Sequence, residues 1–388
     1  MVSDPNSIDL NDECTPYSYQ PVLDVEKNYP PIWDTATLIP GDQAAASLFA
    51  SINASVNSLL PADLPHGAPT GNWTGVTYSS ADPDCWWSWN ECTMPKVSFL
   101  QPDIISVPEP NSWGYGFDDG PNCSHNAFYD FLQQQQQKAT MFYIGSNIMD
   151  WPLQAMRAIT DGHQVCVHTW SHQYMTAFTN EEVFAELYYT RSIIKDILGV
   201  TPLCWRPPYG DVDNRVRYIA SQLNLSTIVW EYDTNDWREG TGSPVVTPDQ
   251  IDANYQEIID AANNGTYANR PGPLVLTHEL TNFTMSEAIK FYPKIKAAFA
   301  HLLPIATALN QTNPYVEQNV TYPTFEQYIS GQNASSGAAG STTASGTIIG
   351  SPSTTATPGK TSLASRQTSQ VFVLLLPAFI AVSCLSMW

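Results

Sequence analysis

The order of apolar runs along residues 101–312 most constrains the fold of this chain. Short apolar runs are separated by stretches of helical character, and four of these runs are Thr140–Ile144, Gln164–Val167, Thr227–Trp230 and Pro273–Leu276. Strands that alternate with helices are typical of βα units, in which helices cover a mostly parallel sheet. The sequence therefore predicts an α/β fold for residues 101–312.

One of the intervening helices has clear start and stop signals. Thr179 followed by Glu182 forms a capping box, and Gly199 with Pro202 ends the helix. The apolar positions between them recur on one face and are Val183, Leu187, Ile194 and Leu198. A helix over residues 180–198 is expected.

The segments on either side of this domain differ in composition. Residues 1–100 are rich in Pro, Asp and Trp with little periodicity, which predicts an irregular extension that wraps the main domain. Residues 313–370 are assigned to a Ser/Thr/Gly-rich stalk, with the strongest shift in composition from Gly331 onward.

Residues 371–388 form an apolar tail without a following basic segment. Small residues, a polar spacer and such a tail are the signal for a glycolipid (GPI) anchor, with the tail removed on maturation and attachment around residues 350–362. A transmembrane helix is the alternative, but the run is short and contains Pro377, whereas spanning takes about 20 residues.

The cysteine count indicates an oxidising compartment. One cysteine, Cys384, lies in the tail, and six lie in the body of the chain: Cys14, Cys85, Cys92, Cys123, Cys166 and Cys204. An even six allows three disulfides. We expect the short loop between Cys85 and Cys92 to be closed by one of them, whereas the other pairings stay open among the 15 connectivities of six cysteines.

Asn-x-Ser/Thr sequons also favour a secreted glycoprotein. Nine are present, at Asn53, Asn72, Asn122, Asn224, Asn264, Asn282, Asn310, Asn319 and Asn333. The stretch Met1–Pro5 has neither a basic region nor an apolar run and does not read as a signal peptide. Either a leader was trimmed or the start site is misplaced.

The charge balance excludes one class of partner. With 16 basic against 37 acidic residues and a net charge of −21, the chain lacks the cationic face that nucleic-acid binding needs. We expect a monomer that binds no nucleic acid.

Five short polar motifs follow predicted strands. They are Phe117–Pro121 (FDDGP), His168–His172 (HTWSH), Arg206–Gly210 (RPPYG), Asp233–Trp237 (DTNDW) and Leu276–His278 (LTH). An isolated Asp-Gly turn, or an isolated buried histidine, would have a purely structural explanation. Together the motifs supply an Asp/His/His set, a spare carboxylate, an arginine and a further histidine, which is the equipment of a metal-assisted hydrolase.

The metal ligands follow from residue type and spacing. His168 and His172 are four residues apart, which would put both imidazoles on one face of a helical turn. With one carboxylate from the Asp118–Asp119 pair they provide three protein ligands and leave a position open for water, the catalytic pattern for zinc. Cobalt or manganese is an alternative to zinc.

The remaining polar residues suit acid–base chemistry. The carboxylate that does not bind metal would serve as general base, and His278 would protonate the departing group, with Asp236 holding its ring. Arg206 is costly to bury alone, so it is expected to pair with Asp118. A glycoside hydrolase is disfavoured because Asp118 and Asp119 are neighbours in sequence, and no Gly-x-Ser-x-Gly elbow of a serine hydrolase occurs.

With these five motifs in order, the chain resembles the polysaccharide deacetylases of carbohydrate esterase family 4, and most closely the fungal chitin deacetylases. The resemblance covers residues 101–312 and implies a distorted (β/α) barrel with the active site at the carboxyl ends of its strands. Glu279 follows His278 where the family commonly has Asp.

The resemblance also implies a role for each motif residue. Asp118 is the general base, Arg206 positions it, and Asp236 tunes the general acid His278. The metal ligands are Asp119, His168 and His172. The backbone N–H of Tyr209 stabilises the oxyanion, while Trp237 and Leu276 form the walls of the pocket for the acetyl methyl group.

The implied reaction is hydrolysis of the N-acetyl groups of chitin or N-acetylglucosamine oligomers, which yields chitosan and acetate. Two alternatives remain at this stage: a deacetylase or esterase for another acetylated glycan, such as xylan or short glucosamine oligomers, or a non-catalytic wall protein that binds polysaccharide. Trp86, Trp87 and Trp89 are expected to pack their loop onto the barrel, with stacking on sugar as the alternative.

Overall fold

A five-stranded parallel sheet forms the centre of the molecule. The computed structural model describes residues 7–61 and 64–331, and its main sheet has the order β3–β4–β5–β6–β7. The strands are β3 (Gly116–Gly120), β4 (Thr140–Tyr143), β5 (Gln164–Val167), β6 (Cys204–Trp205) and β7 (Ser226–Thr227). Because these strands are parallel, their carboxyl ends lie on one edge of the sheet.

Further short strands continue the sheet beyond β3. β10 (Val275–Leu276) pairs in parallel with β8 (Tyr232–Asp233), and a parallel bridge between Asp118 and His278 joins this pair to β3. The order around the molecule is therefore β8, β10, β3, β4, β5, β6 and β7. β11 (His301–Leu303) pairs with β2 (Ser112–Gly114), and β1 (Ser106–Val107) runs antiparallel to β9 (Gly272–Pro273). The result is an incomplete barrel, and the predicted α/β fold is confirmed.

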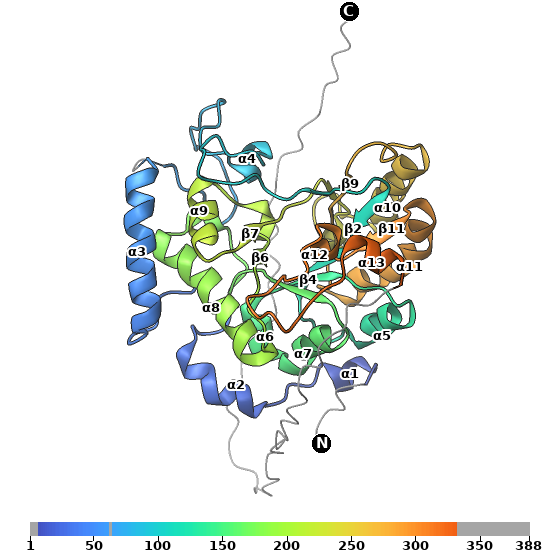
Figure 1. The fold of residues 1–388 in the computed structure, drawn as a ribbon, viewed down its shortest axis with the longest axis horizontal. Coiled ribbons are helices and arrows are strands. Elements are labelled where there is room, and N and C mark those ends of the chain that lie inside the picture. Colours follow the sequence, from blue (N-terminus) through green and yellow to red (C-terminus); the bar gives the residue numbers. More distant parts are fainter. Residues whose placement is uncertain (1–6, 62–63, 332–388) are drawn as a thin grey trace, which may run out of the picture.

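Helices cover the outside of this barrel (Figure 1). Those that follow β3 in the chain are α5 (Asn126–Gln134), α6 (Gly145–Asp150), α7 (Pro152–Thr160), α8 (Asn180–Leu198), α9 (Asn214–Gln222), α10 (Pro248–Asn263), α11 (Asn282–Ala298), α12 (Ile305–Ala308) and α13 (Phe325–Ile329). The helix predicted for residues 180–198 is α8. Its Thr179–Glu182 capping box is present, and Gly199 ends it in the left-handed conformation.

The N-terminal extension packs against the barrel and is more regular than its composition suggests. It contains α1 (Leu10–Glu13), α2 (Gln20–Val25), α3 (Gln43–Leu59) and α4 (Trp87–Asn90). Figure 1 shows α3 as an outer helix beside α8, where Phe49 packs against Phe184 with ring centroids 5.5 Å apart. The wide spacing of its buried residues, Ala45, Ile52 and Val56, explains why the sequence shows so little periodicity there.

Three disulfides link the six body cysteines. Cys85–Cys92 closes the short loop, which confirms the one predicted pairing, and the others are Cys14–Cys123 and Cys166–Cys204. Cys14–Cys123 ties the N-terminal extension to the segment after β3. Three disulfides in one domain are the mark of a protein that folds in the secretory pathway.

The segment assigned to the start of the stalk belongs to the folded domain, which corrects the boundary at residue 313. Tyr315 and Tyr322 are buried, and the Tyr322 hydroxyl donates to the backbone oxygen of His163 at 2.7 Å. Within the parts that the structure describes, none of the helices has the length and apolar character needed to cross a membrane. The rest of the predicted stalk, the apolar tail, Cys384 and Asn333 lie outside the described residues.

Candidate active site

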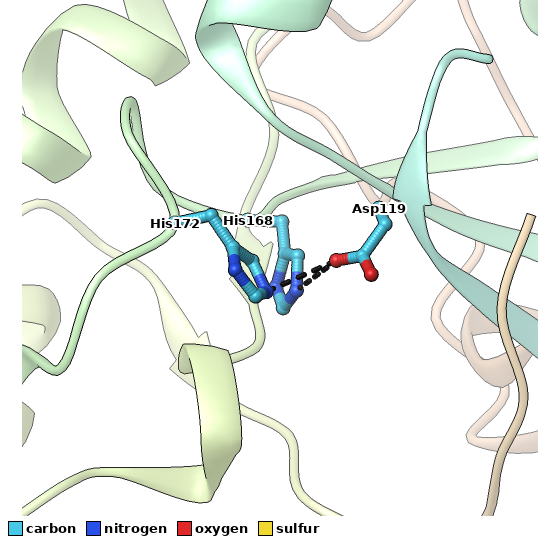
Figure 2. Close-up of side chains that lie close together, drawn as sticks. All are labelled: Asp119, His168 and His172. Atoms are coloured by element: carbon cyan, nitrogen blue, oxygen red, sulfur yellow. Dashed lines mark ion pairs between the residues drawn. The ribbon is translucent and has the colours of Figure 1, made fainter. Parts of the chain in front are cut away.

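Two adjacent carboxylates lie at the carboxyl end of β3. Asp119 has a left-handed backbone (φ 71°), and both side chains are buried. Asp119 Oδ1 lies 3.3 Å from Nε2 of His168 and 3.0 Å from Nε2 of His172. Figure 2 shows both imidazoles directed at this single carboxylate oxygen. The three predicted ligands therefore meet at one point.

The loop that carries the two histidines is not the helical turn that their spacing suggested. Residues 168–172 have no helical structure, and both Thr169 and His172 have positive φ angles, of 65° and 53°. The buried carboxylate of Glu186 on α8 holds this loop by accepting hydrogen bonds from the backbone N–H groups of Trp170 (2.7 Å) and Ser171 (2.8 Å). Tertiary contacts, rather than helical spacing, bring the two rings within 4.9 Å of each other.

The donor set fits a divalent cation. The Nδ1 of His168 lies 2.8 Å from the backbone oxygen of Arg206, so Nδ1 carries the proton and Nε2 presents a lone pair toward Asp119. Asp119 Oδ1 is itself buried and has no hydrogen-bond partner within the described residues. A buried carboxylate oxygen and imidazole nitrogens that converge in this way are consistent with a divalent cation between them. The three ligand atoms lie within 4.8 Å of one another.

The groups that contact Asp119 favour its ionised form. Burial alone would raise the pKa of the Asp119 carboxyl, but His172 and His168 hold this pKa well below its usual range. The ligand carboxylate is therefore ionised at neutral pH.

Asp118 is paired with a buried arginine, as predicted. Arg206 Nη1 donates to Asp118 Oδ1 at 2.7 Å, and both side chains are almost fully buried. The guanidinium also lies 4.0 Å above the ring of Phe142. The other oxygen of Asp118, Oδ2, lies 3.7 Å from Nε2 of His168. Arg206 thus holds one oxygen of Asp118 and leaves the other on the side of the metal ligands.

His278 and Asp236 form a second buried pair. The Nδ1 of His278 donates to Asp236 Oδ1 at 2.6 Å, and the backbone N–H of His278 donates to Asp236 Oδ2 at 3.0 Å. Burial alone would lower the pKa of His278, but the charge and hydrogen bond of Asp236 raise it to about 10, with contributions from Asp119 and Asp118. This histidine is protonated at neutral pH, and Nε2 is the nitrogen left to exchange its proton.

The predicted wall residues differ in exposure. Leu276 on β10 is buried, whereas the side chains of Tyr209 and Trp237 are 41% and 42% exposed. Tyr209 lies in the short 3₁₀ turn Pro208–Gly210 with φ 58°, and its ring is 4.9 Å from that of His172. Trp237 Nε1 donates to Asp233 Oδ2 at 3.4 Å. Tyr209 therefore borders the metal-ligand set, whereas Leu276 lies in β10 and Trp237 lies shortly after the paired strand β8.

Two tryptophans of the Cys85–Cys92 loop pack against the Pro208–Gly210 turn and the residue that follows it. Trp86 is fully buried, and its Nε1 donates to Asp211 at 3.1 Å. Trp87 packs so closely on Gly210 that a Cβ added to the glycine would lie 2.1 Å from the ring. Packing of the loop onto the barrel is thus the outcome for these two residues, and Gly210 is needed for the close approach.

Two supporting residues were not singled out from the sequence. Glu186 lies inside the regular pattern of α8, so nothing local sets it apart. Asn147 donates from Nδ2 to the backbone oxygen of Asp119 at 2.8 Å and lies in α6, directly after β4. Its place after a predicted strand end is the one signal that could have identified it.

The predicted glycosylation sites lie mostly at the surface. Asn72, Asn224, Asn264, Asn282, Asn310 and Asn319 are exposed, and Asn53 and Asn122 are half-buried. The Nδ2 of Asn122 donates to the backbone oxygen of Leu280 at 2.6 Å, so the acceptor nitrogen of this sequon is already engaged.

Comparison with known proteins places these features among deacetylases. The polysaccharide deacetylase family matches residues 106–228. Chitin deacetylase 2 of Cryptococcus neoformans var. neoformans serotype D is 62% identical over 326 residues, which cover 84% of this chain and 70% of the relative. The chitin deacetylase of Amylomyces rouxii is 45% identical over 315 residues, covering 80% of this chain and 74% of the relative.

One solved structure bears on the fold alone. The chitin deacetylase from the fungal pathogen Colletotrichum lindemuthianum superposes with a TM-score of 0.50 at 21% identity. The match covers 56% of this chain and 96% of that chain.

Proposed function

The chain belongs to the fungal chitin deacetylase family, whose members carry a polysaccharide deacetylase domain, and we propose that it hydrolyses the N-acetyl groups of N-acetylglucosamine units in chitin. The products are chitosan and acetate. The observation that carries this proposal is the convergence of Asp119, His168 and His172 beside two buried acid–base pairs.

Asp119, His168 and His172 would hold the cation. Zinc is the ion that we propose, because two imidazoles and one carboxylate are typical of catalytic zinc sites. When bound, it would supply Lewis-acid activation of water and of the acetamide carbonyl.

Asp118 is the proposed general base. Its Arg206-bound oxygen is fixed, and the other oxygen lies toward the metal ligands, where it can take a proton from the attacking water. The ion pair with Arg206 holds Asp118 in one orientation, so Arg206 acts as a positioning residue.

His278 is the proposed general acid. It is held protonated by Asp236, and it lies across β3 from the histidine loop, since β10 and β5 are on opposite sides of that strand. Transfer of its proton to the nitrogen of the departing amine would complete cleavage of the C–N bond. The backbone N–H of Tyr209 would donate to the oxyanion of the tetrahedral intermediate, and Leu276 and Trp237 would enclose the acetyl methyl group.

The location follows from the same family assignment. We propose that the chain is glycosylated at exposed sequons and acts in the fungal cell wall, attached to the outer face of the plasma membrane by a glycolipid anchor at its C-terminal signal. The disulfides and the neutral, extended substrate support an extracellular site of action.

The test is acetate release from N-acetylglucosamine oligomers by the purified protein, before and after chelation and after return of zinc. His168→Ala should abolish release, whereas His301→Ala, which removes a histidine outside the site, should leave it unchanged. Release that survives chelation and His168→Ala would refute the proposed metal site. If the zinc-loaded protein is inactive on chitin but active on acetylxylan, acetylxylan replaces chitin as the assigned substrate.

A further inference from the structure

We propose that Trp33, in the N-terminal extension, forms a sugar-binding subsite at the rim of the active site; this inference rests on the proposed action on N-acetylglucosamine polymers. Trp33 is 46% exposed and its neighbour Ile32 is 42% exposed, although the extension around them is packed onto the barrel. Exposed aromatic and apolar side chains next to a polar site are typical of ligand-binding surfaces.

The segment that carries Trp33 is bound to the histidine loop at both of its ends. The Nε1 of Trp170 donates to the backbone oxygen of Pro31 at 2.9 Å, and Gln173 Nε2 donates to Thr35 Oγ1 at 3.1 Å. Trp170 and Gln173 lie on either side of the ligand His172. Residues 31–35 therefore run along the loop that supplies the two imidazoles.

Trp33 itself is held on α6, which begins at the carboxyl edge of the sheet. Its backbone N–H donates to Ser146 Oγ at 2.8 Å, and its Nε1 donates to Asp150 Oδ2 at 3.1 Å. Asn147, the residue after Ser146, donates to the backbone oxygen of Asp119. One short helix thus contacts both the tryptophan and a metal ligand.

The tryptophan is fixed and exposed at the same time. Its φ of 65° is unusual for a bulky residue and is maintained by the surrounding hydrogen bonds. With both the backbone and the ring N–H satisfied by α6, the ring loses little conformational freedom when a ligand covers its exposed part. A rigid aromatic surface of this kind suits the apolar face of a pyranose ring.

Strand order gives the direction of the sugar chain. Trp33 is bound to α6, the helix that follows β4, and Trp237 follows β8. Between β4 and β8 lie β3, which carries Asp118 and Asp119, and β10, which is followed by His278. A linear glycan that contacts both tryptophans therefore passes over the catalytic groups. Trp33 would bind a sugar beyond the one that is deacetylated, so only longer oligomers reach it.

The experiment compares KM and kcat for acetate release by zinc-loaded wild-type protein and Trp33→Ala on N-acetylglucosamine oligomers of increasing length. We expect KM for the long oligomers to rise roughly tenfold, the equivalent of about 1.4 kcal/mol, with kcat on the shortest active oligomer unchanged. Trp33→Phe should recover most of the affinity, because it keeps an aromatic face. Leu48→Ala, an exposed apolar residue on α3, is the matched control.

Two results would overturn the subsite while leaving the proposed function intact. One is an unchanged KM at every length, and the other is an equal loss at every length, which would mean that Trp33 only supports the histidine loop. Thermal melts of each variant identify the second case. Inactivity of the wild-type protein on all oligomers and on chitin would instead refute the function itself.

Discussion

The His278–Asp236 pair leads to the most direct test of the proposed proton transfer. The charge and hydrogen bond of Asp236 raise the pKa of His278 from 6.5 to about 10, although burial opposes this. The difference corresponds to about 5 kcal/mol in favour of the protonated ring, since a tenfold preference is worth about 1.4 kcal/mol. Asp236→Asn removes the charge but keeps the burial, so the pKa of His278 should fall below 6.5.

The kinetic effect follows from the protonation state. At pH 7 the wild-type ring is almost fully protonated, whereas in Asp236→Asn less than about a quarter of the molecules would carry the proton. We expect kcat at pH 7 to fall by at least about fourfold, and by about a further tenfold for each pH unit above that, because the protonated fraction of the general acid falls in the same proportion. The measurement is kcat for acetate release as a function of pH.

The pH at which kcat falls on the alkaline side of its pH profile (the alkaline limb) distinguishes loss of the His278 proton from general disruption of the site. In Asp236→Asn the limb should move to lower pH by several units. A cation at the metal site offsets the negative charges of Asp119 and Asp118, which lowers the pKa of His278. The alkaline limb of the wild-type protein should therefore lie below pH 10. The variant's limb should still lie at lower pH than that of the wild type. Asp252→Asn, at a half-buried carboxylate outside the site that pairs with Lys290, is the control. An unchanged alkaline limb, or a kcat within about threefold of wild type, would refute the proposed role of this pair.

Three further predictions concern the metal and stability. His168→Ala should lower the bound zinc from one equivalent per chain to a small fraction of that, measured by elemental analysis after dialysis; retention of one equivalent would exclude this residue as a ligand. Burial raises the pKa of Glu279 to about 8 from its ordinary value of 4.5, so the folded state binds an extra proton between these values and stability should fall as pH rises through this window. Glu279→Gln should flatten that dependence of Tm on pH, and an unaltered slope would contradict the assignment. Replacing Cys14 and Cys123 together by alanine opens a loop with a sequence separation of 109 residues and should cost about 2–5 kcal/mol of unfolding free energy, visible as a lower midpoint in urea; an unchanged midpoint would show that the N-terminal extension is held by its other contacts.

Local patterns were sufficient for much of the fold. The capping box at Thr179, the stop at Gly199 and the four apolar runs depend on neighbours within a few residues, so the sequence alone predicts them. Parallel strands bring their carboxyl ends to one edge, which also predicted that motifs far apart in the chain, such as those of Asp118 and His278, meet there.

The sequence was less informative where contacts span the chain. The spacing of His168 and His172 suggested a helical turn, but two residues with positive φ and the buried carboxylate of Glu186 shape that loop instead. Composition likewise placed residues 313–331 in a stalk, although the burial of Tyr315 depends on distant partners such as Val165, whose backbone N–H donates to its hydroxyl.

The sequence by itself determined the types of candidate catalytic group, their order and the strand ends that carry them, because hydrophobic period and turn chemistry are local properties. Only the tertiary structure decided the two longer-range disulfides, the hydrogen bond that leaves Nε2 of His168 facing Asp119, and the position of Trp33 beside the histidine loop. Each of these joins residues more than 35 positions apart, and at such separations pairing is selected by the packing of the whole domain rather than by any neighbouring residue.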